Sequence, residues 1–220
     1  MRESFEKHIQ KLNKDVVDMS EMVASATSMA IKALGDQNIE QANQIIKDDL
    51  LINKKRWQIE EECINLIALQ QPVATDLREI IAVLNIITEL ERMGDYAEGI
   101  ARIAVMLGNE PLVRPLIFLP KMADKAVSML KRSMQALVNR DAKTANAICN
   151  EDDDIDKLYD EAYHDLLTMM IKDPSIVSKA TPLIWASHNL ERIADRVTNI
   201  CERIIFLVTG SMPQVNVSKY

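Results

Sequence analysis

Two pairs of carboxylates are the residues in this sequence that are best able to do chemistry. Glu91 and Asp95 lie in Leu-Glu-Arg-Met-Gly-Asp, and Glu191 and Asp195 lie 100 residues later in Leu-Glu-Arg-Ile-Ala-Asp. In a helix, residues four apart share one face, where two exposed carboxylates repel by about 0.2–0.5 kcal/mol. A bound cation would offset that repulsion, and oxygen ligands suit hard or borderline cations such as Mg, Mn, Fe or Zn. The repeated pair therefore predicts two cation sites on helices.

Polar residues on neighbouring segments extend both candidate sites. Asp49 and Asp152 each interrupt an apolar helical stripe, and Asn53 and Asp156 follow them by one turn. A carboxylate on a buried stripe needs a cation or several hydrogen-bond donors, because otherwise it takes up a proton. We predict that these segments approach the two pairs. The predicted metal ligands are Glu91, Asp95, Glu191 and Asp195, with weaker candidates at Asp49, Asn53, Asp152, Asp156, Asn199 and Glu202.

The elements that would position these side chains are long amphipathic helices. Apolar residues recur at alternating steps of three and four, which is typical of helices packed in bundles. This pattern predicts helices over about 4–34, 39–69, 76–107, 122–137, 142–169 and 183–207. The last three repeat the plan of the first three. We therefore predict an all-α protein of two tandem three-helix bundles related by internal duplication, a pseudo-twofold six-helix chain. The first bundle spans residues 1–109, the second spans 110–212, and 213–220 form a loose tail.

Several residues predict where these helices begin and end. Gly35-Asp36 would end the first helix. Asp76 and Glu79 have the spacing of a capping box at the start of the third. Asp173 and Thr181 each precede a proline, as an N-cap precedes proline at the first helical position. The last helix is therefore either kinked or preceded by a short turn.

Composition narrows the class of protein. The chain has 220 residues, of which 48% are hydrophobic and only 4% aromatic, a mix that favours helices over sheets. Its net charge of −7 argues against a nucleic-acid surface. Cys63, Cys149 and Cys201 are scattered and predict reduced thiols, not a disulfide framework or a zinc knuckle. The N-terminus is too charged for a signal peptide, and no apolar run reaches the ~18–20 residues of a membrane span. A cytoplasmic protein is expected.

The sequence gives little support to catalysis. It shows no Ser-His-Asp or Cys-His arrangement and no glycine-rich loop that could cradle a nucleotide, so we predict that the protein is not an enzyme. A ferritin-like carboxylate oxidase is a weaker alternative, because that class uses Glu-x-x-His on two helices and the helices carrying the two pairs lack this motif. A metal-binding or purely structural helical adaptor stays open, and metal analysis of protein purified without chelator would separate these readings.

The duplicated motif resembles that of the PhoU family, regulators of the phosphate-specific transport system in bacteria and archaea. The likeness extends from Phe5 to Gly210. It includes the run Pro72–Arg78 before the first motif and Asn189–Asp195 with Val208–Gly210 at the end of the chain. Together these segments are more specific than any one of them alone.

The resemblance implies a structure, a cofactor and partners. The family's E(D)-x-x-x-D motif binds iron or zinc in small multinuclear clusters, and it falls here on Glu91 with Asp95 and on Glu191 with Asp195. PhoU-like proteins restrain the phosphate-starvation response and phosphate uptake, coupling the ATPase subunit of the phosphate transporter to a sensor histidine kinase. The resemblance thus implies a negative regulator attached to the membrane only peripherally, through these partners, and it allows a homodimer.

The two halves are not identical, so the two metal sites need not be equivalent. The second half has no counterpart of Asp76-Leu77-Arg78, and Thr198-Asn199 stands where the first half has Glu98-Gly99. His188 lies three residues before Glu191, within helical reach of the pair. Because the first half has no matching histidine, we do not count His188 among the predicted ligands.

Overall fold

The computed structural model describes residues 2–211, with side chains from Phe5 onward, and that part of the chain contains helices and no strand. The α-helices are α1 (Arg2–Asp36), α2 (Ile39–Gln70), α3 (Thr75–Leu107), α4 (Phe118–Asn139), α5 (Ala142–Cys149), α6 (Asp152–Lys172) and α7 (Val177–Thr209), and a 3-10 turn, η1 (Pro174–Ile176), precedes α7. The all-α prediction is confirmed. The predicted tail at 213–220 lies outside the described residues.

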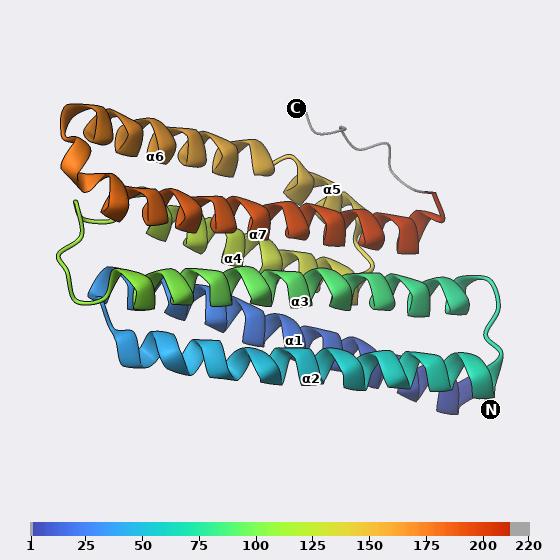
Figure 1. Ribbon diagram of the computed structural model, residues 1–220. Coiled ribbons are helices and arrows are strands. Elements are labelled where there is room, and N and C mark those ends of the chain that lie inside the picture. Colours follow the sequence, from blue (N-terminus) through green and yellow to red (C-terminus); the bar gives the residue numbers. More distant parts are fainter. Residues whose placement is uncertain (1, 212–220) are drawn as a thin grey trace.

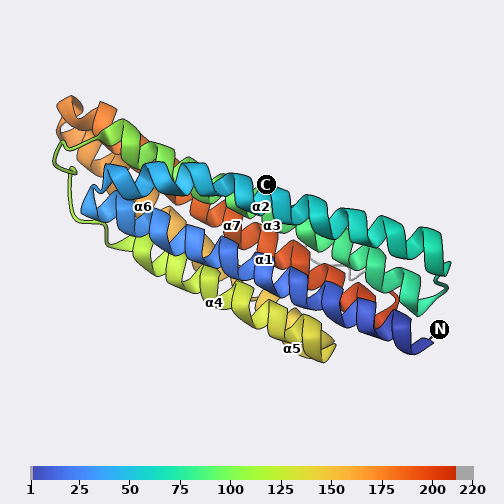
Figure 2. The same cartoon turned by 90° about the horizontal axis from the view of Figure 1, so that it is seen from below.

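The helices lie nearly along one common direction, and the chain reverses between successive long helices, whereas α6 continues in the direction of the short α5 (Figure 1). Helices α1, α2 and α3 pack on one another, as do α4, α5 and α6 with α7. The two groups meet mainly where α3 packs along α7, and also where α1 packs on α4 (Figure 2). Helices α3 and α7 run in opposite directions, as expected for two halves related by a twofold axis.

The long central helices are buried because they are packed on several sides. Leu90 on α3 and Leu190 on α7 are both fully buried, and so are Ile100 and Ile200, at the same 100-residue offset. A helix packed on one side needs only a narrow apolar stripe, whereas α3 and α7 carry wide ones. The wide apolar faces of α3 and α7 are thus explained by neighbours on more than one side.

Polar contacts between α3 and α7 follow the same internal symmetry. The amide of Asn199 donates to Glu89 at 3.1 Å. At the pseudo-equivalent crossing, the amide of Asn189 lies so close to Gly99 that a Cβ there would be 2.9 Å from its nitrogen. Positions 89 and 189 are equivalent in the two halves, and so are positions 99 and 199. In each contact, a residue of the first pair of positions meets a residue of the second pair. The lack of a side chain at Gly99 leaves room for the Asn189 amide.

One predicted helix is broken in the structure. The segment predicted to be helical over 142–169 is divided at Asn150–Glu151 into α5 and α6. Asp152, Asp153 and Asp154 form the first turn of α6, where aspartates are stabilised by the helix dipole and by free backbone N–H groups. Arg132 on α4 holds Glu151 through two hydrogen bonds, the longer of 2.7 Å, and so fixes the break.

Gly35-Asp36 was predicted to end the first helix, and α1 does end at Asp36, before Gln37 in the left-handed region at φ 55°. Two predicted helix starts were wrong. The N-cap of α3 is Ala74, without a side-chain hydrogen bond, so Asp76 and Glu79 form no capping box. Thr181 lies inside α7, where Pro182 is accommodated, and its hydroxyl donates to the carbonyl of Val177. Asp173 does cap the turn η1, accepting from the backbone N–H of Ser175.

Glu79 instead links the two halves. Its side chain is only 5% exposed, accepting a 3.0 Å hydrogen bond from Asn13 of α1 and a 2.6 Å bond from Arg140, the residue that ends α4. A buried carboxylate is tolerated when it is paired and hydrogen-bonded on both oxygens. This contact ties α1, α3 and the α4–α5 connection together.

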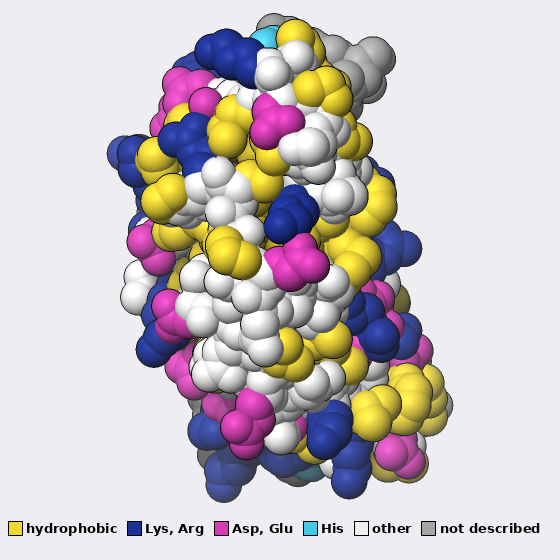
Figure 3. Space-filling model, turned by 60° about the vertical axis from the view of Figure 1, so that its left-hand side comes forward, with side chains coloured by type: hydrophobic (Ala, Val, Ile, Leu, Met, Phe, Trp, Pro, Cys, Tyr) yellow, Lys and Arg dark blue, Asp and Glu magenta, His cyan; other side chains and the backbone are white. Residues whose placement is uncertain are grey.

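Charges of both signs cover the end of the molecule where α3 connects to α4 and α6 connects to α7. Figure 3 shows Lys and Arg side chains there interspersed with Asp and Glu, so the described part of this face carries no continuous basic patch. None of the described helices is long and apolar enough to pass through a bilayer.

Candidate metal centre

The first acidic site lies where α2 approaches α3. Asp49 on α2 reaches Gly94 so closely that a Cβ there would lie 3.3 Å from its Oδ1. Its Oδ2 accepts a 2.8 Å hydrogen bond from Asn53, while Oδ1 is buried without a hydrogen-bond partner. Glu91 and Asp95, on either side of Gly94, act electrostatically on one another and on Asp49. The structure therefore brings these four predicted residues together.

The carboxylates of this site resist ionisation. Burial, followed by the charges of Glu98 and Glu91, raises the pKa of Asp49 above its usual range. Partial burial, followed by the charges of Glu91, Asp49 and Glu98, raises the pKa of Asp95 to about 6. For both residues burial is a larger cause of the raised pKa than the repulsion between carboxylates. The site holds more negative charge than its surroundings neutralise.

Glu98 belongs to this site, although it was not among the predicted ligands. It stands three residues after Asp95 on the same helix face, so its spacing could have shown this. Arg102 donates to Glu98 at 2.5 Å, and Arg56 lies 3.9 Å from Glu91. A hollow of ≈ 190 Å³ adjoins the site, lined by Asp49, Gly94 and Glu98 together with Met22, Ser25, Ala26, Met29, Ile45, Asp48, Leu51 and Ile52.

The second acidic site lies where α6 approaches α7. Asp152 and Asp156 on α6 interact with Glu191 and Asp195 on α7. Asp152 Oδ1 and Glu191 Oε2 are buried and have no hydrogen-bond partner. The prediction that α6 would bring its aspartates to the second pair therefore agrees with the structure.

The second site is the more strongly perturbed of the two. Burial, then the charges of Asp156 and Asp195, raises the pKa of Asp152 to about 7. Burial, followed by the charges of Asp195 and Asp156, also raises the pKa of Glu191 to about 7. Close carboxylates in a low-dielectric setting favour protonation unless a cation joins them. Near neutral pH this site therefore gains most from a bound cation.

His188 stands beside the second site. Its Nδ1 lies 3.3 Å from Glu191 Oε2, in poor hydrogen-bond geometry, so that oxygen counts as unsatisfied. Burial, then the charge of Arg192, lowers the pKa of His188 below its ordinary value. A neutral imidazole is the form that binds metals. His188 was left out of the predicted set, and its one-turn spacing from Glu191 was the signal that pointed to it.

Two weaker candidates are directed elsewhere. Asn199 donates to Glu89 across the α3–α7 interface, and Arg196 lies 3.2 Å from the same carboxylate. Burial raises the pKa of Glu202, the charge of Arg203 lowers it and the charge of Glu89 raises it. The aspartates of α6 are not among the causes. These residues form a polar contact between the halves. The sequence pattern placed them on the correct edge of α7, but the neighbour there is α3.

The chemistry of the gathered side chains fits a cation, although they are not yet arranged around one. Among the described residues, no three His, Cys, Asp or Glu side chains are close enough to hold a metal ion as they stand. At the two acidic sites, a buried carboxylate oxygen on each of Asp49, Asp152 and Glu191 is nevertheless an acceptor that lacks a donor. Small rotations of side chains would be needed to close either site.

The raised pKa values predict how stability depends on pH. Glu191 and Asp152 have pKa values of about 7 when folded, against ~4 in an unfolded chain, so between these values the native state binds more protons. The free energy of unfolding should therefore fall as pH rises from 5 to 8 in the presence of chelator. Because Asp152 is only half-buried, we discount the effect to ~1 kcal/mol, or ~2–4 °C in Tm.

The control for this measurement is an exposed carboxylate farther along α6. Thermal melts of Asp152→Asn should show a smaller fall in Tm between pH 5 and pH 8 than those of the wild type. Glu161→Gln changes an exposed carboxylate that does not act on Asp152 or Glu191, and it should leave the fall nearly unchanged. A wild-type Tm that stays level or rises between these pH values would contradict the assignment.

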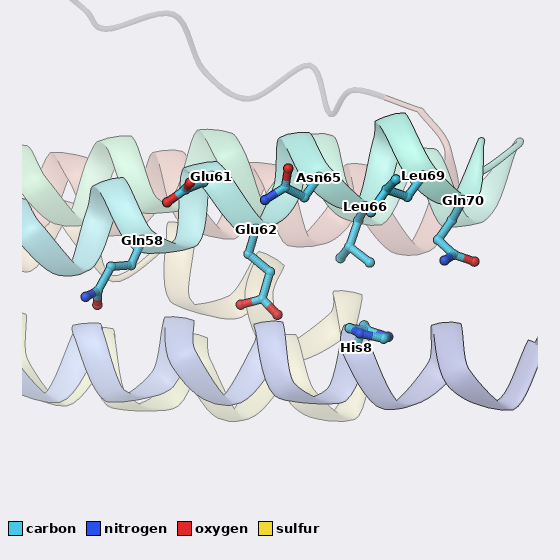
Figure 4. Close-up of a pocket in the computed structure, with 8 residues that line it drawn as sticks. All are labelled: His8, Gln58, Glu61, Glu62, Asn65, Leu66, Leu69 and Gln70. Atoms are coloured by element: carbon cyan, nitrogen blue, oxygen red, sulfur yellow. The ribbon is translucent and has the colours of Figure 1, made fainter.

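Other described features lie apart from the acidic sites. A hollow of ≈ 300 Å³ lies between the N-terminal part of α1 and the C-terminal part of α2, away from both acidic sites (Figure 4). The chain does contain one Glu-x-x-His, Glu161 to His164, but both residues are exposed on α6 and a ferritin-like site needs two such motifs. The three cysteines are free, with Cys63 and Cys201 buried, as predicted.

Fold and site together define a class: a duplicated helical-bundle protein with a Glu-x-x-x-Asp pair on the central helix of each half. A search for known families matches the PhoU domain twice, at residues 16–104 and 119–204. The chain belongs to the PhoU family.

Curated relatives match along nearly the whole chain. The phosphate-specific transport system accessory protein PhoU homolog of Clostridium acetobutylicum is 38% identical over 98% of this chain and 99% of its own length. The homolog of Aquifex aeolicus is 35% identical over 94% of this chain and 93% of its own. The crystal structures of PhoU from Pseudomonas aeruginosa and of the phosphate transport system regulatory protein PhoU from Streptococcus pneumoniae both superpose with a TM-score of 0.89. They are 32% and 31% identical, covering 94% and 96% of this chain and 100% of their own chains.

Proposed function

We propose that this chain is an accessory protein of the phosphate-specific transport system and a negative regulator of the phosphate-starvation response and of phosphate uptake. The observation that carries this proposal is the match to PhoU proteins along nearly the full length, including both copies of the duplicated motif. In this proposal the protein couples the ATPase subunit of the phosphate transporter to a sensor histidine kinase. It resides in the cytoplasm and reaches the membrane peripherally, through these partners.

The protein acts in this proposal by binding and not by catalysis. The two acidic sites gather carboxylates and one imidazole, a set that suits a cation and provides no activated nucleophile. The net charge of −7 makes nucleic acid an unfavourable target, so the regulation passes through proteins.

Iron or zinc is the cation we propose for the acidic sites. Glu91, Asp95 and Asp49 would hold it in the first half, with Asn53 supporting Asp49. In the second half the ligands would be Glu191, Asp195, Asp152 and Asp156. A bound ion supplies positive charge between carboxylates that otherwise favour protonation, and it would join α2 to α3 and α6 to α7. The metal could thereby set how firmly the outer helices are held.

Deletion of the gene tests the regulatory role. The deletion strain should keep the phosphate-starvation response switched on in phosphate-rich medium, because the restraint on the sensor kinase is lost. Reporter expression from a starvation-induced promoter in high and low phosphate provides the measurement. Re-expression of the wild-type chain should restore repression. If a strain with no second copy of the gene represses normally, the regulatory proposal fails while the metal-binding proposal stands.

A metal-free helical adaptor is the second candidate. The observation that favours it is that no three candidate ligands in the described part of the chain already converge on one point. It predicts the same regulatory phenotype but no bound metal, so metal analysis distinguishes the two.

A further inference from the structure

Two thiols meet where α5 ends against α7. Cys149 is the last residue of α5, and its Sγ lies 3.8 Å from the carbonyl oxygen of Thr198 on α7. Cys201 follows Thr198 by one turn, and its side chain leans back toward that turn, because side chains on a helix tilt toward the N-terminus. The thiols of Cys149 and Cys201 are close enough to share a hydrogen bond. Packing thus brings together two cysteines that are 52 residues apart in the sequence.

The two thiols differ in their access to solvent. Cys149 is half-buried, whereas Cys201 is 0% exposed. A small reagent from solution therefore meets Cys149 first, and Cys201 is within reach of the group that forms there. A solvent-accessible cysteine with a second cysteine directly behind it is the arrangement in which one thiol is oxidised and the other resolves it to a disulfide.

The third cysteine shows what a structural thiol looks like in the same chain. Cys63 on α2 is 0% exposed. Burial, followed by the charges of Glu62 and Glu60, raises the pKa of Cys63 to about 12, and no other thiol is among the causes. A cysteine buried in this way, without a partner thiol, is chemically inert. Cys63 therefore provides an internal comparison for the pair at the end of α5.

We infer that Cys149 and Cys201 form an oxidation site for peroxides, at which the two thiols close into a reversible disulfide. The Cys149 sulfur attacks one oxygen of hydrogen peroxide, so that an S–O bond forms, the O–O bond breaks, and a sulfenic acid and one water result. The Cys201 sulfur then attacks the Cys149 sulfur, forming the S–S bond and releasing a second water. Two thiols are oxidised and one peroxide is reduced to two waters. A thiol reductant reverses the change by disulfide exchange.

The disulfide would join the end of α5 to α7. Asp152 begins α6 three residues after Cys149, and Glu151 between them is held by Arg132 of α4. The oxidation state of the pair would therefore determine how firmly α5 and the start of α6 are attached to the central helix of the second half. The inference requires neither the proposed metal nor the proposed regulatory role.

Peptide mapping of the full chain tests the pairing. The reduced protein is treated with hydrogen peroxide in the presence of chelator, and free thiols are then alkylated in urea. In the wild type, peptides containing Cys149 and Cys201 should be joined, Cys63 should be alkylated, and dithiothreitol should restore both thiols. If peroxide is added only after unfolding in urea, pairs that include Cys63 should also appear, because the fold no longer selects the partners.

Two variants separate the roles of the thiols. In Cys201→Ser, dimedone should trap a sulfenic acid on Cys149, because no resolving thiol remains. Cys63→Ser is the matched control and should form the same disulfide as the wild type. Circular dichroism confirms that both variants are folded. A native wild type that keeps all three thiols free after peroxide treatment, or that links Cys63 in place of Cys149 or Cys201, would overturn the inference.

Thermal melts show whether the native fold accommodates the link. The oxidised wild type should melt ~5–10 °C above the reduced protein, because the disulfide closes a loop of ~50 residues and so restricts the unfolded chain. Peroxide should not raise the Tm of Cys149→Ser, which carries the same methionines and so controls for their oxidation. If peroxide shifts the Tm of the wild type no higher than that of Cys149→Ser, the disulfide does not belong to the native fold and the inference fails.

Discussion

An Arg140→Met variant is expected to lose ~3 kcal/mol of unfolding free energy, the largest single-residue effect on stability predicted here. Arg140 donates to Glu79 at 2.6 Å, and the Glu79 side chain is 5% exposed. Removing one partner of a buried pair leaves an uncompensated charge, which typically destabilises by ~3–5 kcal/mol. We take the lower end because Arg140 is 48% exposed. Methionine keeps the length of the side chain, and the left-handed backbone at φ 52° is equally unfavourable for both residues.

Urea unfolding at pH 7 measures this loss of unfolding free energy. Two further variants serve as comparisons. Lys14→Met removes a surface pair whose side chains are 74% and 40% exposed, and should change stability far less than Arg140→Met does. Combining Arg140→Met with Glu79→Met should recover much of the loss, because no buried charge remains. Equal losses in Arg140→Met and Lys14→Met would show that the link between the halves contributes no more than a surface pair.

The helices could be predicted from sequence because their apolar stripes are long and regular. Helix α2 was predicted over 39–69 and spans Ile39–Gln70. The duplication was visible because the two copies share an unusual motif at a constant offset. Periodicity does not report a break that keeps the stripe in phase, so the division at Asn150–Glu151 was missed. The three aspartates 152–154, suited to a first helical turn, were the available signal.

The acidic sites could be predicted only in part, because spacing within a helix is local whereas neighbours are set by packing. Glu91 with Asp95 follows from a one-turn spacing, and Asp49 follows from its place on an apolar stripe. The edge of α7 that carries Asn199 and Glu202 gave no indication that α3 would cover it. Glu79 was assigned to a helix cap because its spacing from Asp76 fitted one. Its partners Asn13 and Arg140 are 66 and 61 residues away, beyond any local pattern.

Metal binding at the second site should raise the Tm of the wild type by ~5–10 °C. A ligand at a hundredfold excess over its Kd stabilises the native state by ~2.7 kcal/mol, and each kcal/mol corresponds to ~2–4 °C in a chain of this size. Thermal melts with added zinc or ferrous iron, compared with chelator, would measure it. The gain should increase from pH 5 to pH 8, because protons compete for Asp152 and Glu191, whose pKa values lie near 7.

Asp152→Asn gives this prediction its most discriminating test, because its two effects have opposite signs. Without metal at pH 8, the variant should be more stable than the wild type, since it carries no buried charge at that position. With metal, it should gain little, so that the order of the two Tm values reverses. Glu202→Gln is the matched control, because Glu202 faces Glu89 and not the aspartates of α6. Wild-type protein purified without chelator that contains no iron or zinc, and whose Tm is unchanged by either ion, would leave the metal-free adaptor as the better account. If metal raised the Tm of the wild type and of Asp152→Asn by the same amount, the ion would be bound elsewhere in the chain.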